Sequence, residues 1–168
     1  CEELGLPITF HISPTLGGNY GLYDEPGLPL LERALEKFPN LVFLGHSQAF
    51  WIEIAPPDPS VSRNSYPDTP ITSEGAVQRL MRKYPNLHGD LSAGSGYNAL
   101  ARDLDHATSF LNEFQDRLYF GTDICAPNTP TPLVDLLKTM RRDGRISRTV
   151  FYKIARKNAI RLLHLQRK

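Results

Sequence analysis

The chain turns from an amphipathic segment into an apolar run at Lys37-Phe38-Pro39-Asn40-Leu41-Val42-Phe43-Leu44-Gly45-His46. Proline ends a helix because it lacks a backbone N–H and disfavours helical geometry in the residue before it. The short apolar run that follows is typical of a buried strand. The same turn recurs at Lys83-Tyr84-Pro85-Asn86-Leu87. This weak internal repeat predicts a chain in which helices and parallel strands alternate.

The rest of the chain continues this alternation. We expect strands at residues 8–13, 41–47, 87–92 and 118–123, and helices at residues 28–38, 74–84, 97–114, 133–142 and 148–163. The helix-to-strand turns are short, whereas the strand-to-helix loops 14–27, 48–72 and 124–132 are long and rich in Pro and Gly. Long loops at the carboxyl ends of the strands are typical of a (β/α) barrel of the TIM type. The sequence therefore predicts an α/β fold of that type.

Length and composition limit the possible functions. The 168 residues, 40% of them hydrophobic, suit one domain over residues 1–168. A net charge of +1 argues against a nucleic-acid partner, and no apolar run is long enough to cross a bilayer. The two cysteines form no disulfide framework, so we expect a cytoplasmic protein. The opening Cys1-Glu2-Glu3-Leu4-Gly5 resembles the last turn of a helix, and we expect a fragment of a longer chain.

Three residues with metal-ligand or acid/base chemistry end the expected strands: His11, His46 and Asp123. Alternation along each strand puts them on one face, and if this face lines a barrel they meet at one height. Imidazole and carboxylate groups bind Zn²⁺, and metal-bound water ionises near neutral pH. Each residue could instead fill a polar position at a strand end. Their matching positions favour a shared site.

Four further residues are candidates for substrate binding. Asp90 and Ser92 end the third strand and could line the same pocket, although Asp90 has an alternative role as a cap or charge partner. Trp51 is either a pocket wall or an apolar plug beneath the Pro-rich loop. Arg63 could recognise a carboxylate, or it could be a solvated charge of that loop.

Several motifs together carry a resemblance to a known family: Thr9-Phe10-His11, Pro39-Asn40-Leu41-Val42-Phe43-Leu44-Gly45-His46, Gly89-Asp90-Leu91-Ser92, Leu118-Tyr119-Phe120-Gly121-Thr122-Asp123 and Asn158-Ala159-Ile160-Arg161-Leu162-Leu163. With these motifs the chain resembles the C-terminal half of the amidohydrolase superfamily, in the amidohydrolase-2 branch related to aminocarboxymuconate-semialdehyde decarboxylase. The resemblance implies that the strands are barrel strands five to eight. It implies that His11 is a metal ligand, that His46 is a catalytic or metal-associated histidine, and that Asp123 both binds metal and moves protons.

The chain departs from this family in one respect, because the His-x-His ligand pair of the family's first strand does not occur in it. We expect the parent protein to be a metal-dependent hydrolase of a small polar metabolite, using one divalent ion, Zn²⁺ or else Mn²⁺. The alternatives are a non-oxidative decarboxylase of a small carboxylic acid and a non-catalytic half-barrel that serves assembly. We also expect a homo-oligomer or association with the missing half of the barrel.

Overall fold

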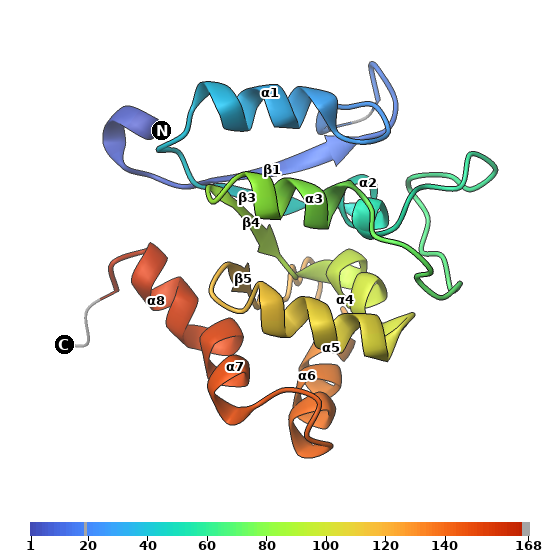
Figure 1. The fold of residues 1–168 in the computed structure, drawn as a ribbon, viewed down its shortest axis with the longest axis vertical. Coiled ribbons are helices and arrows are strands. Elements are labelled where there is room, and N and C mark those ends of the chain that lie inside the picture. Colours follow the sequence, from blue (N-terminus) through green and yellow to red (C-terminus); the bar gives the residue numbers. More distant parts are fainter. Residues whose placement is uncertain (19, 166–168) are drawn as a thin grey trace.

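The computed structural model describes residues 1–18 and 20–165, and these form an α/β fold around one parallel sheet (Figure 1). The five strands lie in the order β2-β1-β3-β4-β5. Their bounds are β1 Ile8–Ser13, β2 Leu22–Tyr23, β3 Phe43–His46, β4 Leu87–Asp90 and β5 Leu118–Tyr119. The expected parallel α/β architecture is confirmed. The sheet is open, with β2 and β5 at its edges, so the barrel and its strand numbering stay predictions.

Three of the expected strands, β3, β4 and β5, are shorter in the structure. β3 stops at His46 because Ser47 adopts φ 111° and starts helix α2 (Gln48–Trp51). β5 ends at Tyr119, and the Phe120 N–H that follows it donates to the carbonyl of Ile154. Asp123 therefore lies beyond the end of its strand. The first long loop, in turn, contains the short strand β2 that the sequence did not predict.

The helices follow the expected segments with one clear error. Their bounds are α1 Pro29–Lys37, α3 Ala76–Lys83, α4 Ala93–Ala101, α5 Leu104–Glu113, α6 Pro132–Arg142, α7 Arg148–Tyr152 and α8 Asn158–Leu162, with short turns η1 Glu2–Leu4, η2 Ile52–Ile54 and the π-helical η3 Lys153–Lys157. The single helix expected over residues 97–114 is wrong. Asp103 breaks it, because its side chain accepts from the N–H groups of Asp105 and His106 and so caps α5.

The two faces of the sheet differ in their covering. Phe10, Phe43, Leu87 and Leu118 are buried in the core against the helices. Gly45 belongs to this face, where the ring of Phe50 fills the space that a Cβ would need. The face on which we expected the candidate residues is the more open one.

On that open face the side chains are only partly covered. Thr9 is exposed, and His11, Leu44, His46 and Asp90 are half-buried. The alternation predicted from the sequence is therefore confirmed for these strands.

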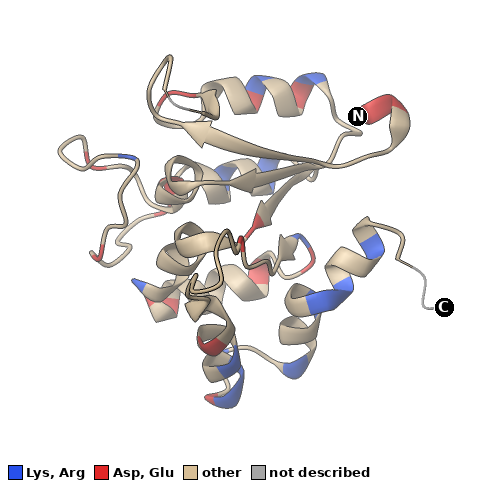
Figure 2. Ribbon diagram, turned by 180° about the vertical axis from the view of Figure 1, so that it is seen from behind, with Lys and Arg blue, Asp and Glu red and all other residues tan. Residues whose placement is uncertain are grey.

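Outside the sheet, Lys and Arg side chains recur along α7, η3 and α8 (Figure 2). None of the helices described here is long and apolar enough to cross a membrane.

Candidate functional site

The tips of β1 and β3 bring the two candidate histidines side by side. The parallel register pairs His11 with His46, and the centroids of their rings are 5.6 Å apart. Ser47, the residue after β3, links the end of β1 to the first turn of α2. Its hydroxyl oxygen accepts from the Ile12 N–H at 3.2 Å and from the Phe50 N–H at 3.2 Å.

Asp90 at the end of β4 holds the ring of His46. His46 Nδ1 lies 3.2 Å from Asp90 Oδ2 and 3.2 Å from Ser92 Oγ. The Ser92 hydroxyl donates to Asp90 Oδ2 at 3.0 Å, and the Ser92 N–H donates to Asp90 Oδ1 at 2.9 Å. Because the hydroxyl proton of Ser92 is directed at Asp90, both neighbours of Nδ1 present acceptor atoms. This arrangement favours a proton on His46 Nδ1 and directs Nε2 toward the rim.

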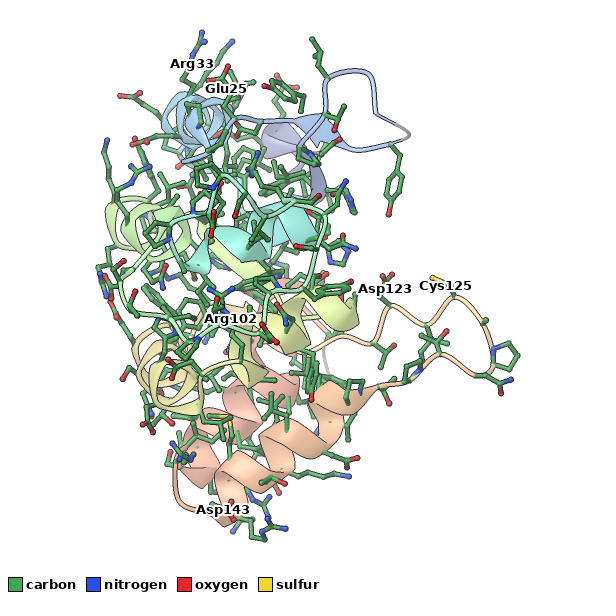
Figure 3. All side chains as sticks on the ribbon, turned by 90° about the vertical axis from the view of Figure 1, so that its right-hand side faces the viewer. Glu25, Arg33, Arg102, Asp123, Cys125 and Asp143 are labelled. Carbon is green, nitrogen blue, oxygen red and sulfur yellow. The ribbon has the colours of Figure 1, made fainter. Side chains whose placement is uncertain are left out.

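Asp123 completes the rim from the loop after β5. Its Oδ2 lies 3.9 Å from His46 Nε2, and its side chain is 48% exposed against 15% for His46. The residue has φ 54°, a left-handed conformation that few non-glycine residues adopt. Figure 3 shows Asp123 at the start of the projecting loop that carries Cys125. The structure thus brings His11, His46 and Asp123 to one edge of the sheet.

The charges of these groups are set by their neighbours. The hydrogen bond to Asp90 raises the pKa of His46 above its ordinary value, against the opposing effect of burial. Burial, and after it the nearby His46, lowers the pKa of His11. Burial of Asp90 acts to raise its pKa, but the hydrogen bonds from His46 and Ser92 hold it below the ordinary value. Near neutral pH this favours a neutral His11 and an ionised Asp90.

The rim has donors of the right chemistry for a metal but too few in position. Neutral imidazole and carboxylate groups suit Zn²⁺ and Mn²⁺. Within residues 1–18 and 20–165, however, no group of three or more His, Cys, Asp and Glu side chains could hold a metal ion. The described part of the chain therefore offers part of a metal site and does not fit a complete one.

Two of the four substrate-binding candidates lie in this site and two lie elsewhere. Asp90 and Ser92 contact His46 directly. Trp51 is 1% exposed, and its Nε1–H donates to the Asp90 carbonyl at 2.8 Å, so it is the apolar plug of the two alternatives. Arg63 is not a solvated loop charge, because its Nη2 lies 3.0 Å from Oε1 of the buried Glu53.

Sequence reasoning missed two features near the rim. Tyr20 lies against His11, with ring centroids 4.3 Å apart, although no periodic pattern marks the loop that carries it. A hollow of about 350 Å³ lies beside them, lined also by Ser13, Gln48 and Asn64. Its polar lining suits a small polar molecule.

A protein-family model described as Amidohydrolase matches residues 1–165. No curated protein and no solved structure matches the chain.

Proposed function

Because the chain belongs to the amidohydrolase family, whose model matches residues 1–165, we propose that it forms part of a metal-dependent hydrolase of a small polar metabolite. Within the superfamily we favour the amidohydrolase-2 branch, with β1, β3, β4 and β5 as barrel strands five to eight. The observation that carries the proposal is the position of His46, which lies between Asp90 and Asp123 at a rim shared with His11.

The side chains of this chain supply proton handling at the rim. Asp90 accepts from His46 Nδ1, which leaves Nε2 directed toward Asp123 and able to exchange a proton with a bound molecule. Asp123 is an exposed carboxylate and can accept a proton from an attacking water. The neutral imidazole of His11 is suited to ligation rather than to proton donation.

A divalent metal, Zn²⁺ or Mn²⁺, would supply water activation in such an enzyme. His11, His46 and Asp123 are the residues of this chain that could contribute donors to it. Because they do not form a complete set in the described residues, we propose that other residues provide the remaining ligands. Partner residues or a further segment of the protein are the candidates.

The proposal is tested by steady-state kinetics on the protein in its native assembly. Asp123→Asn should lower turnover by about 10²–10³-fold, because the amide keeps the shape but cannot accept a proton. The matched control is Asp143→Asn, which changes an exposed carboxylate that pairs with Arg142 far from the rim. Release of CO₂ from small carboxylic acids, with no hydrolysis of esters, lactones or amides, would indicate a decarboxylase instead. Near-normal turnover in Asp123→Asn would overturn the proposed role of Asp123, and an absence of turnover in the native assembly would favour the non-catalytic half-barrel.

A further inference from the structure

Arg102, the C-cap residue that follows α4, has a guanidinium group for which the described part of the chain offers no partner. Among residues 1–18 and 20–165 no ion pair or hydrogen bond is found for its side chain, and its Nε is buried and unpartnered. Burial lowers the pKa of Arg102, while Asp103 partly opposes this effect. The neighbouring Asp103 carboxylate is itself occupied, because it accepts from the N–H groups of Ile71, Asp105 and His106. A desolvated charge without a partner is costly, so an anion here would be stabilising.

A cavity of about 540 Å³ lies beside Arg102, between the end of α4 and the Pro-rich loop 55–73. Its apolar walls are Ile52, Pro56, Pro57, Val61, Pro67 and Pro70. This volume is in the range that small-molecule sites occupy in proteins, and such sites combine apolar walls with few polar groups. Figure 3 places Arg102 in the body of the molecule, away from the loop that begins at Asp123.

The loop that forms the wall of this cavity is held at several points. The Arg63 guanidinium contacts the buried Glu53 and donates to the Asp24 carbonyl at 2.7 Å. The Asn98 side chain donates to the Pro67 carbonyl at 3.0 Å, and the Ile71 N–H donates to Asp103 at 3.1 Å. The walls are therefore fixed before any ligand enters, which lowers the entropic cost of binding.

We propose that this cavity binds a small carboxylate with an apolar body, its carboxylate on the Arg102 guanidinium. A guanidinium presents a planar fork of donors that matches a carboxylate. Two acidic residues of the cavity, Asp58 and Asp68, repel a dianion such as phosphate more strongly than a monoanion. The apolar proline rings suit an aromatic or aliphatic body. This site shares no lining residue with the hollow beside His11 and Tyr20.

Benzoate is the probe for the test, and benzamide is its neutral analogue of similar shape. Calorimetry and amide NMR on the full chain should show saturable benzoate binding that shifts signals of Ile52 and Val61, and benzamide should not bind. Arg102→Gln should weaken benzoate binding by 10-fold or more. The matched control Arg33→Gln removes an exposed guanidinium of α1 and should leave it unchanged.

Arg102→Lys is the second variant, in case the glutamine variant folds poorly. It keeps the charge but loses the planar fork, and it should weaken binding to an intermediate degree. The proposal is overturned if benzoate does not bind, if it binds Arg102→Gln as well as the unmodified protein, or if the shifted signals belong to the rim residues His11 and Asp123.

Discussion

Arg63→Met should destabilise the fold strongly, although Arg63 lies in a surface loop. The side chains of Arg63 and Glu53 are only 9% and 1% exposed, and their charged atoms are 3.0 Å apart. Methionine retains much of the apolar volume of arginine but removes the charge. Among the residues that the structure describes, one hydrogen-bond donor to the Glu53 carboxylate would then remain. It is the Gly27 N–H, which donates to Oε2 at 3.1 Å.

The magnitude follows from the burial of the pair. Removing one partner of a buried ion pair costs about 3–5 kcal/mol, because it leaves the other charge uncompensated. That is a large part of the ~5–15 kcal/mol by which a domain is stable. With a urea slope of about 2 kcal/mol/M, the midpoint of unfolding should fall by roughly 2 M.

The loss of folding stability in Arg63→Met should also depend on pH, in a defined direction. Burial raises the pKa of Glu53 above its ordinary value, and Arg63 opposes this rise. Without Arg63 the folded-state pKa rises further, so the folded variant binds a proton more tightly than the unfolded chain does. The folded state of the variant should therefore regain stability as pH falls below the folded-state pKa of Glu53. It should lose stability as pH rises through that pKa. The difference from the unmodified protein should be larger at pH 7 than at pH 5.

Urea unfolding followed by circular dichroism at both pH values measures these differences. Arg33→Met is the control, since Arg33 is an exposed residue of α1, and it should change stability by no more than ~0.5 kcal/mol. Glu53→Leu in the Arg63→Met background should restore much of the loss, because no charge then remains buried. An Arg63→Met variant within ~0.5 kcal/mol of the unmodified protein would refute the reasoning.

Three further outcomes are expected. Asp90→Leu should lower the pKa of His46 in an NMR titration, because the hydrogen bond to Asp90 is the main cause of its rise; an unchanged titration would exclude this role of Asp90. Gly45→Ala should cost about 1–3 kcal/mol in urea unfolding, because the Phe50 ring occupies the space of the new methyl group, and a neutral effect would mean that the ring moves freely. The isolated chain should self-associate through its uncovered sheet edges and open face, and sedimentation as a monomer at micromolar concentration would contradict this.

The sequence predicted the parts of the fold that depend on local pattern. The Pro-Asn turns and the apolar runs placed the strands, and alternation put His11 and His46 on the same face. The break between α4 and α5 was missed, because the apolar positions continue through it and only the cap at Asp103 marks it. The early end of β5 was also missed, because the apolar run continues past Tyr119 and no local signal marks the last paired residue.

The candidate site shows the same limit. His11 and His46 could be identified because strand ends converge at one edge of a parallel sheet, and Asp123 because the loop that follows β5 leaves the sheet at that same edge. The role of Arg63 could not be identified from the sequence. It depends on Glu53, ten residues away, and no local pattern reveals that Glu53 is buried. For Trp51 the sequence left two alternatives, a pocket wall and an apolar plug. The packing of the indole against Gly89 favours the plug.

The Ser47 hydroxyl has a consequence for how the site opens. One oxygen accepts from the first turn of α2 and from the end of β1, through the amides of Phe50 and Ile12. Rotation of the Ser47 side chain would remove the acceptor from both amides at once, so we expect both to become exposed to exchange with deuterium in the same opening event although they lie in separate elements. Local fluctuation at the rim is then cooperative, and the tips of β1 and β3 open as a unit with the helix that follows.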